Sequence, residues 1–175
     1  MRRMFVVFVL SLLLPAGVLA QGAGPFSRLE GQWSGNGTID MQDGRREALR
    51  CRASYDVLEQ GHGLQLSIRC ASESFNFNLQ SSAKVSGGRV SGVWSESTLN
   101  AGGALTGRAE GDRINVIANG QSFSADLNLT TRGDRQSVQI KSRDPQSQVV
   151  GASMTLRRTL GRTFLTACPS ISATW

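Results

Sequence analysis

The alternation of apolar and polar residues is the feature that most restricts the fold of this chain. Between Glu30 and Arg158, apolar residues fall on every second position in one short segment after another, and tight turns join the segments. A slip of one residue at any turn would point the apolar side chains of the next strand outward. Since the phase is kept throughout, we predict an all-β fold: a single closed or nearly closed antiparallel up-and-down barrel of about ten strands.

The turns also predict which residues face each other. A two-residue turn at Gln60-Gly61 places apolar residues opposite apolar residues along both flanking strands. The predicted pairs there are Val57 with Leu64, Tyr55 with Leu66, Ala53 with Ile68, and Cys51 with Cys70. Turns at Gly87-Gly88, Gly111-Asp112, Gly120-Gln121 and Gly133-Asp134 predict the pairs Val85 with Val90, Ala109 with Ile114, Ala118 with Phe123, and Leu129 with Val138.

The first 20 residues have the pattern of a secretory signal. Arg2 and Arg3 precede an apolar run from Met4 to Leu14 that is too short to span a bilayer, and small residues lead to Ala20. We expect an exported protein, periplasmic or secreted, with no membrane anchor after cleavage. The predicted organisation is a signal peptide over 1–20, a barrel domain over 21–158 and a flexible C-terminal tail over 159–175.

The charge of the chain does not favour nucleic acid as a partner. Without Arg2 and Arg3, 17 basic residues remain against 13 acidic ones, a net charge of +4. The basic residues are nearly all arginines scattered along the predicted strands, and aromatic residues do not alternate with them. We therefore expect these charges to form an ordinary solvated surface.

The up-and-down order brings the last predicted strand beside the first, so that Trp33 and Arg158 lie together in inward phase at one end. A guanidinium stacked on an indole is worth on the order of 1 kcal/mol or more when it is shielded from water. We predict that Trp33 and Arg158 close this end of the barrel.

The residues Gly31-Gln32-Trp33, followed by Ser34-Gly35-Asn36-Gly37, resemble the G-x-W opening of the calycin superfamily, which includes lipocalins, fatty-acid-binding proteins and nitrobindin-like barrels. The resemblance covers the overall plan from about Phe26 to Arg158, and it implies packing of the first-strand tryptophan on a last-strand arginine. The link from Met41 to Arg46 is too short for the helical lid of fatty-acid-binding proteins, and no lipocalin-like helix follows the barrel. Haem binding of the nitrobindin type is disfavoured because the sole histidine, His62, lies in or beside a turn.

The predicted pairing of two cysteines is consistent with export, because disulfides persist in oxidising compartments. Cys51 and Cys70 are opposed inward positions on neighbouring strands, within reach of disulfide geometry, and we expect them to be oxidised. The loop that they close would stabilise the fold by about 3 kcal/mol in the chain-entropy model. Cys168 is left over, as a free thiol or an intermolecular bridge.

The links at the end away from Trp33 are mostly longer than the turns at the closed end, so a cavity would open there. A ten-stranded barrel encloses more volume than an eight-stranded one, and many inward positions are glycine or alanine. The alternative is a packed core, in which the inward aromatic residues fill the space. If a cavity exists, its predicted ligand-binding side chains are Tyr55, Phe75, Phe77, Trp94 and Glu96.

Glu96 is, on this interpretation, the one carboxylate in inward phase, and it could hold the polar head of a ligand or simply reach water at the rim. Arg45 and Arg46 in the first upper link would attract an anionic ligand, or are ordinary loop charges. We identify no catalytic triad, carboxylate pair, phosphate-binding glycine loop or metal-site spacing, so we expect neither an enzyme, nor a metal, nor a cofactor.

The function that this pattern favours is an exported barrel that binds or carries a small apolar or amphipathic molecule. One alternative is a protein-binding barrel, since some exported bacterial protease inhibitors resemble lipocalins and block a protease with their N-terminal segment, here Gln21 to Arg28. The other is a structural envelope protein with a packed core.

Overall fold

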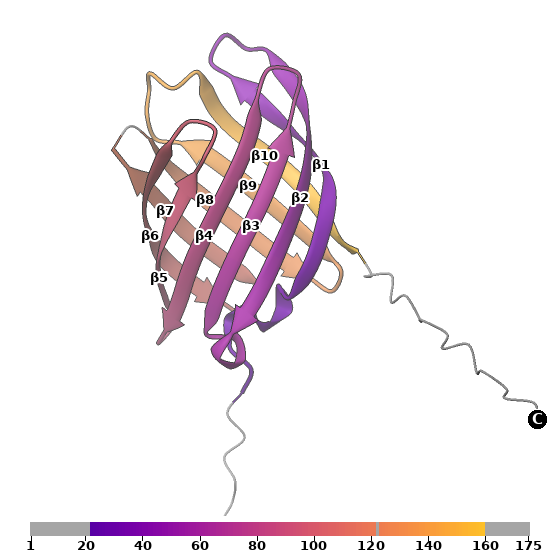
Figure 1. The fold of residues 1–175 in the computed structure, drawn as a ribbon, viewed down its shortest axis with the longest axis vertical. Coiled ribbons are helices and arrows are strands. Elements are labelled where there is room, and N and C mark those ends of the chain that lie inside the picture. The colour runs from indigo at the N-terminus through magenta and orange to yellow at the C-terminus, as the bar shows by residue number, and fades with distance from the viewer. Residues whose placement is uncertain (1–21, 122, 160–175) are drawn as a thin grey trace, which may run out of the picture.

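The computed structural model describes residues 22–121 and 123–159, which form a closed ten-stranded antiparallel barrel (Figure 1). Each strand pairs with its neighbour in sequence, and the last pairs with the first. The strands are β1 (Gly31–Met41), β2 (Arg46–Leu58), β3 (Gly63–Ala71), β4 (Asn76–Ser86), β5 (Arg89–Glu96), β6 (Ala101–Glu110), β7 (Arg113–Gly120), β8 (Ser124–Arg132), β9 (Arg135–Ser142) and β10 (Val149–Thr159). Two short 3-10 helices, η1 (Pro25–Arg28) and η2 (Glu59–Gly61), lie at one end.

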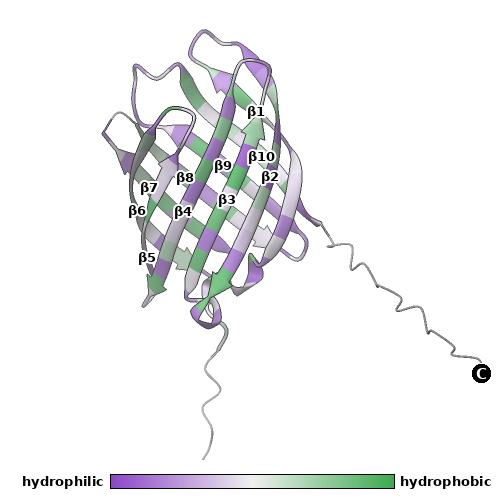
Figure 2. Cartoon of the chain, in the orientation of Figure 1, coloured by the Kyte–Doolittle hydropathy of each residue, from purple (hydrophilic) through white to green (hydrophobic). Residues whose placement is uncertain are grey.

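The predicted fold class is confirmed, and so is the predicted register at four of its five hairpins. Cys51 pairs with Cys70, Val85 with Val90, Ala109 with Ile114 and Leu129 with Val138. Figure 2 shows the result as strands on which hydrophobic and hydrophilic residues alternate.

The predicted pairing of Ala118 with Phe123 is wrong, because Ala118 pairs with Ala125. The last pair of this hairpin is Asn119 with Ser124, whose hydroxyl donates to the Asn119 amide oxygen over 2.9 Å. Gly120 therefore stays in its strand, and the link is longer than the two residues expected. A shift of two residues keeps the phase, so the inward face is unchanged.

The first and last strands approach each other closely at Gly35. Gly35 lies opposite Leu156, and a Cβ atom built on Gly35 would overlap the carbonyl oxygen of Thr155. Only glycine lets the two backbones come this near at the seam where the barrel closes. The glycine that follows Trp33 in the G-x-W-x-G opening thus has a packing role.

The end that holds Trp33 is closed by packing. The Arg158 guanidinium lies 4.4 Å from the centre of the Trp33 ring, and the indole N–H donates to the Leu29 carbonyl over 2.7 Å. Arg158 also donates to the carbonyls of Arg28, over 2.7 Å, and Glu30. Phe26 of η1 and Leu29 are almost completely buried against this cluster. The segment before β1 is therefore part of the closed end.

No helix within the described residues is long and apolar enough to cross a lipid bilayer. The predicted signal peptide over 1–20 and the tail beyond Thr159, including Cys168, lie outside the described residues.

Candidate ligand-binding site at the open end of the barrel

Several apolar residues on the inner face of the barrel are only partly buried. Register places Leu66, Ile68 and Leu79 on the same face as the buried Cys51 and Ala53, yet all three are only half-buried. The same holds for several inward residues on other strands, namely Phe77, Val116, Leu127, Leu129 and Ile140. All of these residues pack against the two buried apolar clusters of the inner face. Whether they leave a cavity between them, or close into a packed core, stays a prediction.

A pocket of about 450 Å³ lies at the end away from Trp33, where the β1–β2, β3–β4 and β9–β10 links meet. Its apolar wall is formed by Met41 and Phe75, and its polar wall by Gln42, Asp43, Arg45, Ser74 and Gln148. Phe75 stacks on Phe77 with ring centres 6.2 Å apart and planes 14° apart. This volume is within the usual range for sites that hold a small molecule. We call it the rim pocket.

Glu47 is an inward carboxylate beside the rim pocket that the sequence interpretation missed. It lies opposite Ile39, and its Oε2 accepts hydrogen bonds from the Ser72 hydroxyl over 2.7 Å and the Ser74 backbone N–H over 3.0 Å. These donors, the Ser72 hydroxyl first, hold the pKa of Glu47 below its usual value. The prediction that Glu96 is the one inward carboxylate is therefore wrong. The signal was present, since Glu47 shares the phase of Leu49 at the start of β2.

Glu96 is buried, and its carboxylate binds backbone N–H groups of the β5–β6 link and of β4. Oε1 accepts from the N–H groups of Asn78 (2.8 Å) and Thr98 (3.0 Å), and Oε2 accepts from that of Leu99 (2.6 Å). Burial raises the pKa of Glu96, but these hydrogen bonds lower it by more, so the net shift is downward. The structure thus shows a hairpin-stabilising role for Glu96, and its contact with a ligand stays a prediction.

The pH dependence of stability tests this role of Glu96. Because the pKa of Glu96 is lower in the folded state, its contribution is fully present above the unfolded value of about 4.5 and is lost as the pH falls through the folded value. We expect Glu96→Gln to lower the melting temperature at pH 7, and the gap to the parent protein to shrink in acid.

Circular dichroism melts from pH 7 to pH 3 measure this gap. Glu110→Gln is the matched control, because the Glu110 side chain is 75% exposed. A gap for Glu96→Gln that stays constant over the whole pH range would contradict the role of the charged carboxylate.

Trp94 is a predicted site residue with an unsatisfied hydrogen-bond donor. It is only 6% exposed, and its indole N–H is a buried donor without a hydrogen-bond partner among the described residues. Phe123 packs against the indole edge to face, with ring centres 5.8 Å apart, and Leu105 and Ala118 belong to the same cluster. An unpaired buried donor costs about 1–3 kcal/mol, so an acceptor brought by a ligand would be favourable there.

Tyr55 lies in the closed-end core and not at the rim. Its ring contacts Trp33 edge to face with centres 6.4 Å apart, and its hydroxyl donates to the Gln136 amide oxygen over 2.7 Å. Gln136 in turn donates to Thr131 over 3.3 Å, which completes a buried polar chain. Burial raises the pKa of Tyr55, so the hydroxyl stays protonated.

The remaining candidates are placed as follows. Cys51 and Cys70 form a disulfide between β2 and β3, with Cα atoms 4.1 Å apart. The Arg45 side chain pairs with Asp43 over 2.7 Å at the rim pocket, and Arg46 pairs with Asp40 over 2.6 Å. His62 is exposed beside η2. Within the described residues, His, Cys, Asp and Glu side chains form no group of three or more suited to a metal ion.

Comparison with known proteins shows similarity at the level of the fold. No protein-family model matches the chain, and no curated protein sequence matches it. The crystal structure of Rv2717c from M. tuberculosis superposes with a TM-score of 0.61 at 15% identity, covering 77% of this chain and 94% of that one. The S-type phycobiliprotein lyase CPES from Guillardia theta superposes with a TM-score of 0.55 at 13% identity, covering 78% and 92%.

The class that the fold defines is a closed ten-stranded antiparallel barrel. The calycin resemblance of the G-x-W opening is consistent with this barrel and stays a prediction. Since both identities are far below 25%, the similarity concerns the fold alone.

Proposed function

We propose that this protein binds a small apolar or amphipathic molecule inside the open end of the barrel, as an exported carrier and not as an enzyme. The observation that carries the proposal is the unpaired indole N–H of Trp94, buried among apolar side chains on the inner face. An apolar interior with one unmet donor suits a ligand whose body is hydrophobic and which carries a hydrogen-bond acceptor.

Three further observations support this proposal. The rim pocket has a suitable size and lies at the end away from Trp33, with Met41 and Phe75 on its apolar side. The barrel fold is shared with a protein named as a phycobiliprotein lyase, and fold similarity is consistent with a ligand-binding barrel without indicating the ligand. The disulfide between Cys51 and Cys70 is compatible with export, because such bonds persist in oxidising compartments.

The protease-inhibitor alternative receives less support. It needs a free N-terminal segment, but Phe26 is 1% exposed, and Arg28 and Leu29 supply carbonyl acceptors to the closed end. Freeing this segment to enter a protease would uncover the Trp33 cluster.

The experiment that tests the carrier function starts with native mass spectrometry of the exported protein, followed by organic extraction. We expect a mass above that of the polypeptide and a co-extracting small molecule. A bare polypeptide mass, together with no saturable binding of either probe described below, would reject the proposal and favour an envelope protein without a ligand.

The role of Trp94 is tested with two fluorescent probes of similar size. Prodan carries a ketone acceptor, and diphenylhexatriene is a pure hydrocarbon. We expect both to bind the parent protein, and Trp94→Phe to weaken Prodan about two- to tenfold, the value of one net hydrogen bond, while diphenylhexatriene is unaffected. Equal loss for both probes would mean that Trp94 contributes shape and not its N–H group.

A further inference from the structure

Closure of the barrel gathers arginines that lie far apart in the sequence into one row on its outer surface. Arg69 of β3 pairs with Arg52 of β2, and Arg52 pairs with Ser34 of β1. Ser34 pairs with Arg157 of β10, which in turn pairs with Arg135 of β9. Directly paired residues lie side by side on the same face, so the four arginines and Ser34 form a continuous line across five strands. We call this line the arginine row.

The arginine row is poorly compensated within the described part of the chain. All four arginines are exposed, and the one ion pair recorded for them joins Arg157 to Asp134 at 3.7 Å. Arg50, also exposed, shares the outer face of β2 with Arg52 and forms no ion pair with a described residue. Like charges directly opposed on neighbouring strands destabilise a sheet. Arg52 with Arg69, and Arg135 with Arg157, are two such pairs, so the row suits an anionic partner.

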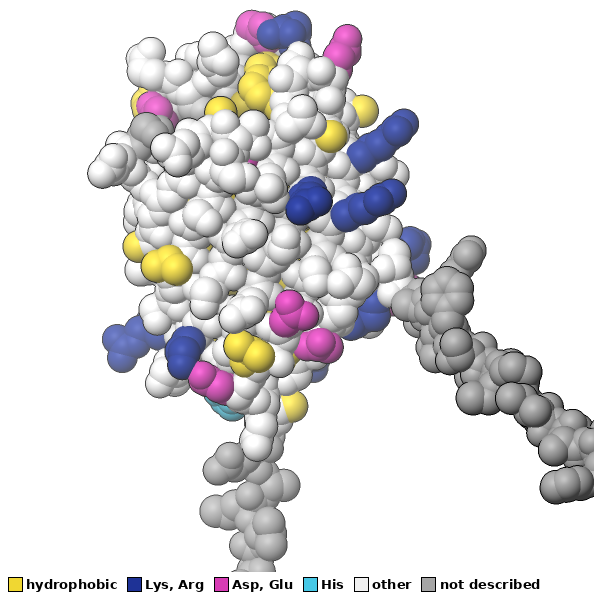
Figure 3. Space-filling view, viewed as in Figure 1, with side chains coloured by type: hydrophobic (Ala, Val, Ile, Leu, Met, Phe, Trp, Pro, Cys, Tyr) yellow, Lys and Arg dark blue, Asp and Glu magenta, His cyan; other side chains and the backbone are white. Residues whose placement is uncertain are grey.

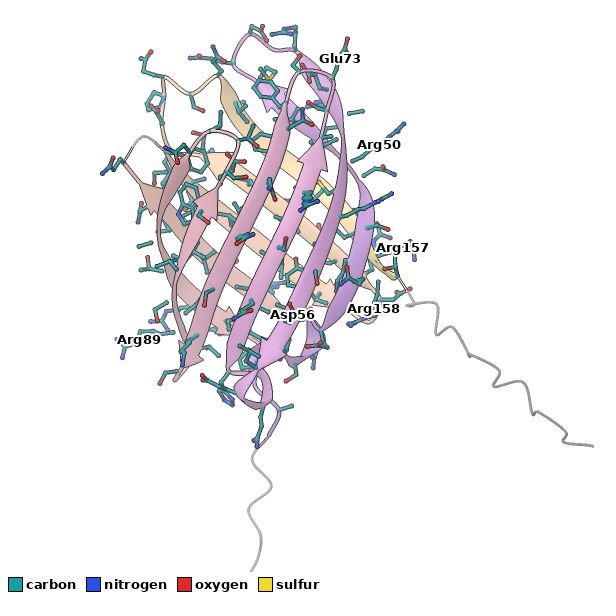
Figure 4. All side chains as sticks on the ribbon, in the orientation of Figure 1. Arg50, Asp56, Glu73, Arg89, Arg157 and Arg158 are labelled. Carbon is teal, nitrogen blue, oxygen red and sulfur yellow. A yellow bond between two sulfur atoms is a disulfide. The ribbon has the colours of Figure 1, made fainter. Side chains whose placement is uncertain are left out.

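The figures show the same arrangement. Strands β1 and β2 form one edge of the barrel, and dark-blue side chains project from that edge while the broad face beside it is mostly uncharged (Figure 3). Arg50 and Arg157 both point outward along this edge (Figure 4).

We propose that the arginine row binds a linear anionic polysaccharide that carries carboxylates. Neighbouring strands lie about 4.8 Å apart, so Arg69 and Arg52 are one strand apart, as are Arg157 and Arg135, and the strand of Ser34 separates the two pairs. Each guanidinium can hold a carboxylate through two parallel hydrogen bonds. The short polar neighbours on the outer face, such as Asn36 and Ser54, leave the row accessible and offer further hydrogen bonds. The site lies outside the barrel, so it is independent of the ligand proposed for the interior.

Two other anionic partners fit the row less well. It spans five of the ten strands and so follows half the barrel, whereas a flat membrane surface would meet only part of it. Single-stranded nucleic acid is held by aromatic residues on which bases stack. The aromatic residues of these five strands are Trp33 and Tyr55, and both are buried inside the barrel. A flexible polysaccharide needs neither a flat binding surface nor aromatic residues for stacking, so it can follow the curved row.

The test compares two double variants that remove the same charge. Arg52→Ser with Arg69→Ser removes one end of the arginine row. Arg89→Ser with Arg108→Ser removes another exposed, directly opposed pair, on β5 and β6. Binding of a size-selected alginate oligosaccharide to the full chain is measured by isothermal titration calorimetry at several salt concentrations, with a neutral cello-oligosaccharide as the control ligand.

We expect the parent protein to bind alginate in a salt-dependent manner and to ignore the neutral sugar. The Arg52 and Arg69 variant should lose about tenfold in affinity, since each exposed charge pair is worth up to a factor of about five, and the Arg89 and Arg108 variant should lose less than about twofold. The melting temperature of the Arg52 and Arg69 variant should not fall, because this variant removes two like charges that face each other on neighbouring strands.

Equal losses in both variants would overturn the proposal, because they would show an effect of net charge alone. Stronger binding to oligo-dT or to phosphatidylglycerol vesicles than to alginate would also overturn it, in favour of a nucleic acid or a membrane. Since the Prodan assay reports on the interior, failure of the arginine row and failure of the carrier function are separate results.

Discussion

Replacement of Trp33 by alanine should lower the free energy of unfolding by about 3–5 kcal/mol, the range for removing a large buried aromatic side chain. Trp33 is 1% exposed, and it contacts Tyr55, the Arg158 guanidinium and the Leu29 carbonyl. A domain of ordinary stability has only about 5–15 kcal/mol in total, so this variant should lie near the limit of folding. Urea denaturation followed by circular dichroism measures the loss.

The control for Trp33→Ala is Val93→Ala, because Val93 is 60% exposed on the outer face and should change stability by less than about 0.5 kcal/mol. Arg158→Met measures the contribution of the guanidinium apart from that of the indole ring, because methionine keeps an apolar side chain but lacks the stacked cation. We expect it to lose less than Trp33→Ala. If Trp33→Ala unfolds at the same urea concentration as Val93→Ala, the tryptophan does not close the barrel in solution.

The second large effect is expected from the disulfide. Replacing both Cys51 and Cys70 by alanine should cost about 3 kcal/mol, since the crosslink joins residues 19 apart and restricts the unfolded chain. Both positions are buried inward, and alanine fits them without adding volume. The melting temperature of the double variant should therefore fall by several degrees relative to the oxidised parent.

The comparison is best made in a Cys168→Ser background, so that bonds between molecules cannot form. Treatment with a reducing agent should bring the oxidised parent down to the stability of the double variant and leave the double variant unchanged. Detection of free thiols at Cys51 and Cys70 in the unreduced, denatured parent would show that the bond does not form.

Much of the fold was predictable because its determinants are local. Whether Val57 faces Leu64, or Cys51 faces Cys70, depends on a turn of a few residues and on a period of two, and both are visible in a short stretch of sequence. The one wrong pair, Ala118 with Phe123, came from a link longer than the two-residue turn assumed. Turn length is the weakest local signal here, because Gly120 serves equally well as a strand residue and as a turn residue.

The candidate site was predictable only in part. Alternation identified Phe75, Phe77 and Trp94 as inward residues, and the link lengths indicated which end would open. It did not show that the carboxylate of Glu96 binds three backbone N–H groups, nor that Tyr55 donates to Gln136, which lies 81 residues away. Hydrogen bonds of this kind depend on the positions of several strands at once, and no short pattern encodes them.

The sequence by itself determined the all-β barrel, its strand order and the inward phase of Trp33 and Arg158, because side-chain alternation and tight turns act between neighbours in the chain. Only the tertiary structure decided that η1 seals one end, that the indole N–H of Trp94 is buried without a partner among the described residues, and that Arg135 and Arg157 join Arg52 and Arg69 in one row. The physical reason is closure: pairing β10 with β1 brings together residues more than 100 positions apart, and their contacts follow from the geometry of the whole barrel.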